Sequence, residues 1–271
     1  MNRPGRIALH GGGEFHPGDE PFLRAILEAA AARAGVGPPV ARPDETGDGP
    51  RDHAPRLRVV LLPTAAAGER PEMAVDVGSA AFRRVASEAG IAIDIQAAMV
   101  VDAASAAAPG KADRLARADL VYLPGGDPGR LAAILPGSPA WGAVLSAHAR
   151  GAVVAGASAG AMILAAWTWT GSGGAIGLGL VPGIVVVPHA ERVARGGWAG
   201  TFARRVPPGI GPLGALGLDE RTGIVSEPDA ARDGMPVAWR VVGPGVVHWT
   251  PAGERTIRDL RHGDTLSFDG D

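Results

Sequence analysis

Five short apolar runs alternate with longer helical stretches along the first 160 residues, and this alternation constrains the fold most. The runs span residues 7–9, 57–62, 91–95, 120–123 and 152–155. Each is rich in Val, Ile and Leu, as is typical of a strand buried on both faces of a parallel sheet. The helical stretches span residues 21–34, 72–89, 112–118, 129–135 and 140–149. The order predicts right-handed βαβ units and an α/β fold whose mostly parallel sheet is flanked by helices.

Two segments depart from this rhythm. Residues 35–56 combine Pro, Gly and charge with few apolar side chains, which predicts a flexible surface insertion. From about residue 181, apolar runs at 184–187, 237–242, 246–250 and 265–268 are separated by turn signals and predict a β-rich extension of the same sheet. A length of 271 residues suits one large domain or two small ones. Because the late strands are expected to extend the same sheet, we expect one α/β domain over residues 1–271.

Composition excludes several classes of protein. The net charge of −2 leaves no basic surplus for phosphates, so no nucleic-acid partner is expected. The chain has no Cys, which excludes disulfide scaffolds and a Cys nucleophile. No run approaches the ~18 apolar residues of a membrane span, and the N-terminus lacks the long apolar region of a signal peptide. A cytoplasmic protein without a membrane partner is the expectation.

A candidate nucleophile lies in the run Gly156-Ala157-Ser158-Ala159-Gly160. An apolar strand precedes this G-x-S-x-G pattern, and a stretch compatible with a helix, residues 161–167, follows it. Small residues permit the sharp turn that exposes the serine hydroxyl, and the free N–H groups of a helix start favour a developing oxyanion. Small-residue runs are also common in an alanine-rich chain, but the strand-turn-helix context favours Ser158 as nucleophile.

A serine nucleophile needs a base, and the base needs a carboxylate. Of seven histidines, His189 directly follows an apolar strand, where ligands bind in α/β sheets, whereas His248 lies inside a late strand. No Asp or Glu lies between Ser158 and His189, so the acid must come from elsewhere. We prefer Glu220, with Asp219 and Glu191 as alternatives.

Two glycine-rich strand exits are candidates to line the same crevice. Residues 120–131 place Gly125 and Gly126 after a strand, where backbone N–H groups can approach a reacting carbonyl. An ordinary βα loop explains these glycines equally well. The run at residues 10–15, HGGGEF, is the second exit.

Taken in order, these motifs resemble the cyanophycinase and dipeptidase E group of serine peptidases. The shared pattern runs over most of the chain and comprises Gly11-Gly12-Gly13-Glu14, Pro63-Thr64-Ala65, Gly125-Gly126-Asp127, Ser158-Ala159-Gly160, Pro188-His189, Gly217-Leu218-Asp219-Glu220 and Gly243-Pro244-Gly245. The resemblance implies a flavodoxin-like, class I glutamine amidotransferase-like fold. It also implies a triad of Ser158, His189 and Glu220, with the Gly126 and Ala159 amides as oxyanion hole.

The resemblance implies a short peptide, or a peptide-like small molecule, as substrate. Gly125 and Asp127 are expected to contact it, and Arg192 and Arg195 could bind its carboxylate or form a solvated loop. Cyanophycinases carry Gln where this chain has Pro128, and Asp-Gln where it has Val187-Pro188. These differences argue against cyanophycin as substrate.

Two other functions remain open at this stage. An α/β-hydrolase esterase would use Ser158 with Asp219 or Asp233 and with His248 or His262, and the HGGG run resembles its oxyanion motif. A non-catalytic binding module on the same scaffold is the second alternative. No cofactor is expected, and no metal, because H-x-x-x-H and H-E-x-x-H motifs are absent. A homodimer is compatible with the sequence.

Overall fold

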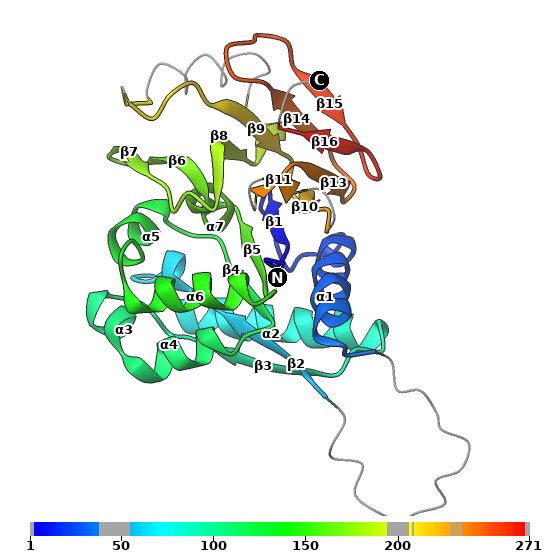
Figure 1. The fold of residues 1–271 in the computed structure, drawn as a ribbon, viewed down its shortest axis with the longest axis vertical. Coiled ribbons are helices and arrows are strands. Elements are labelled where there is room, and N and C mark those ends of the chain that lie inside the picture. Colours follow the sequence, from blue (N-terminus) through cyan, green and yellow to red (C-terminus); the bar gives the residue numbers. More distant parts are fainter. Residues whose placement is uncertain are drawn as a thin grey trace, which may run out of the picture.

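A central eight-stranded sheet organises the computed structural model, which describes residues 3–37, 55–193, 206–207, 209–228, 231–232 and 235–268. The strand order is β16-β13-β10-β1-β5-β4-β2-β3 (Figure 1). Five strands pair in parallel: β1 (Ile7–His10), β2 (Leu57–Leu61), β3 (Ile93–Ala97), β4 (Leu120–Leu123) and β5 (Val153–Ala157). They coincide with the five apolar runs, so the predicted α/β class with a mostly parallel sheet is confirmed.

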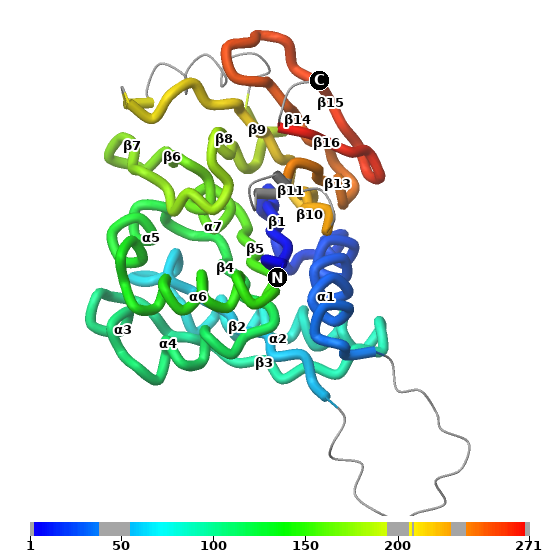
Figure 2. Tube along the Cα trace, viewed as in Figure 1, coloured from blue at the N-terminus to red at the C-terminus, as the bar shows by residue number. Residues whose placement is uncertain are grey.

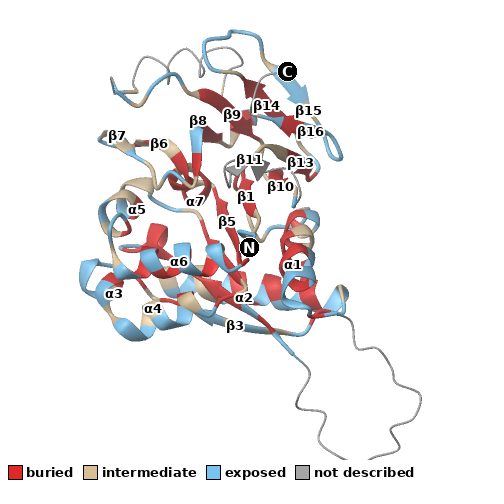
Figure 3. Cartoon of the chain, viewed as in Figure 1, coloured by how far each residue is buried: buried red, intermediate tan, exposed pale blue. Residues whose placement is uncertain are grey.

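Helices cover both faces of this sheet. Along β4, Leu120 and Tyr122 belong to a core formed with α1 (Glu20–Ala34) and α2 (Pro71–Glu88). Val121 and Leu123 point to the opposite face and to a second core. The helices on that side are α3 (Ala103–Ala107), α4 (Pro109–Ala116), α5 (Pro128–Ile134), α6 (Pro139–Ala149) and α7 (Ala159–Leu164). In Figure 3 the central strands are buried, and the outer helix faces are exposed.

Helix boundaries follow local chemistry. A proline stands at the first turn of α1, α2, α4, α5 and α6, where the missing N–H would have no intrahelical partner. Helix α1 ends at Ala34 and is capped by Gly35, whose φ of 67° is left-handed. Most of the predicted insertion, residues 38–54, lies outside the described residues.

The β-rich C-terminal part is confirmed, but its strands divide between two sheets. Strands β10 (Gly223–Ser226), β13 (Ala238–Val242) and β16 (Thr265–Ser267) extend the central sheet in antiparallel pairing. A second sheet has the order β15-β14-β9-β8-β6-β7. Its members are β6 (Ala165–Thr170), β7 (Gly173–Ile176), β8 (Val181–Pro188), β9 (Gly214–Leu218), β14 (Val247–Thr250) and β15 (Arg258–Leu260). The remaining short elements are β11 (Ala231–Arg232), β12 (Met235–Pro236) and two 3-10 turns, η1 (Thr64–Ala66) and η2 (Ala190–Arg192).

The expected helix over residues 161–167 is too long. Helix α7 ends at Leu164, and Ala165 begins β6. Trp167, Thr168 and Trp169 have high β propensity and pair with β7 and β8, which outweighs the helical spacing.

Strand β1 lies in the middle of the molecule, between β5 and β10 (Figure 2). The carboxyl ends of β1, β4 and β5 therefore meet at one edge of the sheet. Within the described ranges, no helix has the length and apolar character needed to cross a membrane.

Candidate active site

Ser158 occupies a sharp turn between β5 and α7. Its φ of 49° and ψ of −114° are uncommon for a residue with a side chain. The flanking glycines are required by close backbone contacts. A Cβ on Gly156 would lie 2.3 Å from the Gly160 carbonyl oxygen, and one on Gly160 would lie 2.1 Å from that of Leu123. The G-x-S-x-G run therefore forms the strand-turn-helix elbow that its spacing predicts.

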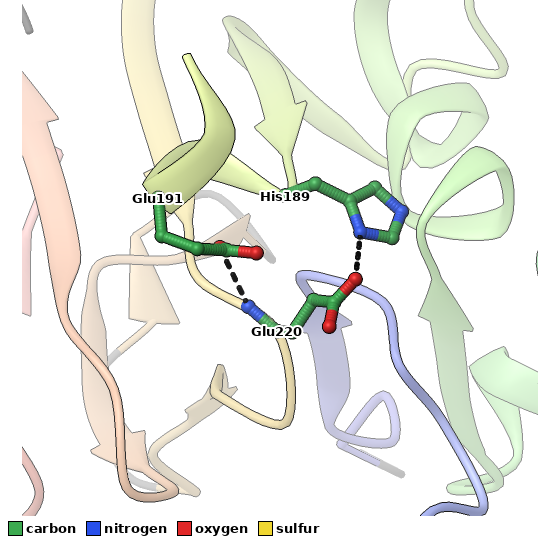
Figure 4. Close-up of side chains that lie close together, drawn as sticks. All are labelled: His189, Glu191 and Glu220. Carbon is green, nitrogen blue, oxygen red and sulfur yellow. Dashed lines mark hydrogen bonds and ion pairs between the residues drawn. The ribbon is translucent and has the colours of Figure 1, made fainter. Parts of the chain in front are cut away.

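A chain of hydrogen bonds joins Ser158 to His189 and Glu220. Ser158 Oγ lies 3.1 Å from His189 Nε2, and His189 Nδ1 lies 2.7 Å from Glu220 Oε1. Strands β8 and β9 are parallel with Pro188 opposite Leu218, so the residues after both strands leave at the same edge. Figure 4 shows His189 and Glu220 approaching each other from these two strand ends.

The exit of β1 contacts the backbone around each member of this chain. The carbonyl of His10 accepts the Ser158 N–H at 2.9 Å, and that of Gly11 accepts the His189 N–H at 2.8 Å. A Cβ on Gly12, whose φ is 105°, would lie 2.4 Å from the His189 ring. The first glycine-rich run therefore lines the site, as its position after a strand indicated.

A buried contact between the side chains of His10 and Asp19 supports this strand exit. His10 Nε2 lies 2.9 Å from Asp19 Oδ1, and both side chains are almost fully buried. The His10 Nδ1 atom accepts the Gly12 N–H at 3.3 Å, and Asp19 Oδ2 accepts the Phe15 N–H at 2.8 Å. The pair thus holds the start of the glycine run and its end in one conformation.

Charged neighbours keep Glu220 ionised. Burial raises the pKa of its carboxyl. The hydrogen bond from His189 and the charge of Arg192 together lower this pKa by more than burial raises it, so the pKa lies below its ordinary value. The Arg192 guanidinium pairs with Glu220 Oε1, and Arg192 Nε lies 3.5 Å from Glu191 Oε1. An ionised carboxylate can orient the imidazole of His189 and stabilise its protonated form.

The two alternative acids make other contacts. The Glu191 side chain accepts the Glu220 backbone N–H at 3.0 Å, as Figure 4 shows, and so supports the turn that carries Glu220. Asp219 accepts the Val246 N–H at 2.9 Å and pairs with His248 at 3.3 Å. His248 is buried and also contacts Asp259 at 2.7 Å. Ser158 therefore contacts His189, whereas the esterase histidine His248 pairs with two aspartates.

The loop after β4 lies beside Ser158. A Cβ on Gly125 would lie 3.2 Å from Ser158 Cβ. Gly126 has a φ of 142°, and a Cβ there would lie 2.4 Å from the Ala65 carbonyl oxygen. In the described part of the chain, the Gly126 N–H donates to no acceptor. The Ala159 N–H, in the first turn of α7, has no intrahelical partner.

Three of the residues expected to contact substrate, Gly125, Asp127 and Arg192, already have partners within the chain. The Asp127 carboxylate caps α5 by accepting the Gly129 N–H at 2.7 Å, and the Gly125 N–H already donates to Glu14. Arg192 contacts Glu220 and Glu191, so a substrate carboxylate would compete with both. Arg195 lies outside the described residues.

One group of side chains has the spacing of a metal site, although no metal was expected. The ligand atoms of His189, Glu191 and Glu220 lie within 4.8 Å of one another. However, Glu220 Oε1 already accepts from His189 and faces the Arg192 guanidinium. A cation there would have to displace both contacts and face the positive charge of Arg192.

Sequence reasoning gave no role to Glu14 or to the pair of His10 and Asp19. For Glu14, a carboxylate directly after a glycine-rich strand exit was the available signal. No comparable signal marked Asp19, because nothing in its neighbourhood indicates a buried partner.

Comparisons with known proteins bear on this geometry. A family model described as peptidase family S51 matches residues 53–205, a range that contains Ser158 and His189 and ends before Glu220. No curated protein matches the sequence. The chain is similar to the crystal structure of a peptidase from an acI-B1 Actinobacterium, with 24% identity, a TM-score of 0.69, and coverage of 98% of this chain and 97% of that one. It also matches a crystal structure named for a peptidase E protein from Listeria monocytogenes EGD-e, with 15% identity, a TM-score of 0.47, and coverage of 82% of this chain and 94% of that one.

Proposed function

The chain belongs to peptidase family S51, as its resemblance to the cyanophycinase and dipeptidase E group implied, and we propose that it hydrolyses an amide bond in a short peptide through an acyl-enzyme. The observation that carries this proposal is the continuous hydrogen-bonded chain from Ser158 through His189 to Glu220. This arrangement is that of an activated nucleophile, in which a base contacts the serine and a carboxylate orients the base.

In the first half of the reaction, His189 Nε2 removes the proton of Ser158 as Oγ attacks the substrate carbonyl carbon. The Gly126 and Ala159 N–H groups would stabilise the resulting oxyanion. His189 then gives its proton to the leaving nitrogen, the amide C–N bond breaks, and the amine departs. Glu220 stays ionised and stabilises the imidazolium while it exists.

In the second half, water attacks the ester carbon of the acyl-enzyme. His189 accepts a proton from this water, and a second tetrahedral intermediate forms at the same two N–H groups. The intermediate collapses, Ser158 Oγ leaves and recovers the proton from His189, and the carboxylic acid is released. One water is consumed for each amide bond cleaved.

The structure weighs against the esterase alternative. That triad would join Ser158 to His248 or His262, whereas the Ser158 hydroxyl contacts His189. A binding module on the same scaffold would keep the fold but would not need the aligned Ser158, His189 and Glu220. The residues that differ from those of cyanophycinases, Pro128, Val187 and Pro188, favour peptides other than cyanophycin as substrate.

A peptide panel tests this function. Purified protein would be incubated with α-linked and β-aspartyl dipeptides, with short acyl esters as comparison, and the amine released from the peptides or the alcohol released from the esters would be quantified. We expect cleavage of at least one peptide by the natural protein and none by Ser158→Ala. Full activity in Ser158→Ala would contradict the assignment of the nucleophile. Cleavage of esters alone would favour the esterase, and binding without turnover would favour the binding module.

A further inference from the structure

Glu14 makes a contact with the loop after β4 that spans 111 residues of sequence. Its Oε1 atom accepts the Gly125 N–H at 2.7 Å in a partly buried setting. A Cβ on Gly125 would lie 2.7 Å from that oxygen and 3.2 Å from Ser158 Cβ. Glu14 and Ser158 therefore lie close to the same glycine, and the Glu14 carboxylate reaches the edge of the proposed site.

The loop is fixed at the residues before and after Gly126. Glu14 holds the Gly125 N–H, and the Ala65 carbonyl accepts the Asp127 N–H at 2.9 Å. The N–H of Gly126, between these two contacts, donates to no acceptor among the described residues. The two contacts set the orientation of the Gly126 N–H, which is the donor that this loop offers to an oxyanion beside the Ala159 N–H of α7.

The residues on either side of Glu14 make close contacts of their own. Phe15 donates its N–H to the buried Asp19, and its ring lies 5.5 Å from Tyr122 and 6.2 Å from Phe82 between ring centroids. On the other side, a Cβ on Gly13 would lie 3.1 Å from the side chain of Glu220. Because Glu14 is partly buried and lies between two residues with such contacts, holding its side chain against Gly125 costs less conformational entropy than ordering a fully exposed side chain would.

We propose that Glu14 is a positioning residue of the reaction, which holds Gly125 so that the Gly126 N–H points at the developing oxyanion. The inference rests on the proposed function. Glu14 would act through the loop and would not touch the reacting atoms. Its role requires an acceptor oxygen at the right reach, and does not require a negative charge.

Three substitutions of Glu14 separate the contributions of its side-chain length, its negative charge and its hydrogen bond to Gly125. Glu14→Gln keeps an acceptor oxygen at the same reach, Glu14→Ala removes it, and Glu14→Asp keeps the charge but shortens the side chain by one methylene. Glu28→Ala, an exposed position on α1, is the matched control. The measurement is the second-order rate of phosphonylation by a fluorophosphonate, whose phosphoryl oxygen enters the oxyanion hole, together with kcat and KM on the best peptide.

We expect Glu14→Ala and Glu14→Asp to lower the phosphonylation rate and kcat by about 10- to 100-fold, less than the hundreds-fold loss of a deleted oxyanion donor. KM should change by less than about twofold, because ground-state binding is retained. For Glu14→Gln, the phosphonylation rate and kcat should stay within about threefold of those of the natural protein, and for Glu28→Ala both should equal them. Thermal denaturation of each variant shows whether it is folded. If Glu14→Ala does not fold, Glu14→Asp and Glu14→Gln carry the test.

Two results would overturn the inference while leaving the proposed function intact. One is that the fluorophosphonate labels Glu14→Ala and Glu14→Asp as fast as it labels the natural protein. The other is a Glu14→Gln variant as slow as Glu14→Ala, which would mean that charge matters more than the hydrogen bond. A natural protein that is not labelled and cleaves no peptide would refute the proposed function, and this inference with it.

Discussion

Backbone strain is concentrated at the proposed site. Among the described residues, four non-glycine residues have positive φ: Phe15, Ser158, His189 and Arg221. Two of them are in the proposed triad, and the other two directly follow Glu14 and Glu220. Conformations of this kind cost on the order of 1 kcal/mol each and persist only where the surroundings enforce them. Hydrogen bonds to the exit of β1 enforce three of these positions, since Ser158, His189 and Arg221 all donate to it.

At the residue scale, Glu220→Gln tests the acid. The amide can still contact His189 but cannot stabilise an imidazolium, and it can select the wrong tautomer. We expect kcat to fall by about three to four orders of magnitude. Glu254→Gln, an exposed position, should leave kcat unchanged in the same peptide assay. If the kcat of Glu220→Gln stays within about tenfold of that of the natural protein, another carboxylate must be the acid of the triad.

The lowered pKa of Glu220 also predicts a pH dependence of stability. A carboxyl whose pKa is lower in the folded than in the unfolded state stabilises the fold above its unfolded pKa. That stabilisation is lost as pH falls through the folded pKa, hence below about pH 4.3, the ordinary value for glutamic acid. Urea denaturation at several pH values should show the stability difference between the natural protein and Glu220→Gln shrinking on acidification. A difference that grows would mean a raised pKa.

At the element scale, the elbow between β5 and α7 depends on its glycines. A Cβ on Gly160 would meet the Leu123 carbonyl oxygen of β4, which belongs to the sheet backbone and cannot rotate away. We expect Gly160→Ala to lower the free energy of unfolding by at least about 2 kcal/mol, or to prevent folding.

Gly142→Ala is the matched control for this substitution. Gly142 is exposed on α6, and a Cβ there would meet nothing within 4 Å, so the change should stabilise by up to about 1 kcal/mol. Urea denaturation of both variants measures the contrast. A Gly160→Ala variant as stable as Gly142→Ala would be incompatible with the close contact of α7 and β4.

The elements predicted from sequence are those whose local pattern is strong. The five parallel strands and the helices α1, α2, α4, α5 and α6 follow from apolar runs, spacing and proline starts. Strand β3 lies at the edge of the sheet and is partly exposed, so the expected burial on both faces is wrong for this strand. Helix α7 was overextended because residues 161–167 are all apolar or aromatic, and pairing with β7 and β8 decides between helix and strand. The division of the late strands between two sheets was also missed, because strand pairing depends on contacts between distant segments.

The candidate site shows the same limit. Ser158 and His189 could be singled out because each follows an apolar strand. The choice of Glu220 over its neighbour Asp219 could not be made from spacing, since it depends on which side chain the turn after β9 directs toward β8. The contact between Glu14 and Gly125 joins segments 111 residues apart, and no local pattern encodes it.

At the scale of the whole molecule, one core extends across both sheets. Trp239 of β13 and Trp249 of β14 belong to different sheets, and each packs against Phe268, with ring centroids 5.3 and 4.9 Å apart. All three contribute to the core that also contains α5, α6 and α7. We therefore expect a single cooperative unfolding transition in differential scanning calorimetry. Two separate transitions would show that the sheets unfold independently, against one domain over residues 1–271.

Because the core is shared, a destabilising substitution near the C-terminal end should destabilise the whole domain. Phe268→Ala should lower the temperature of that single transition as a whole, because it removes a half-buried ring between two tryptophans. A variant in which only part of the heat absorption moves to lower temperature would contradict a shared core.

The central claim is that Ser158 is a nucleophile activated by His189 and Glu220. Mass spectrometry of the intact protein after incubation with a fluorophosphonate, followed by peptide mapping, tests it most directly. We expect one adduct per chain on Ser158, none on Ser158→Ala, and much slower labelling of His189→Ala and Glu220→Gln. No adduct on the folded natural protein, or an adduct that persists in Ser158→Ala, would contradict the account.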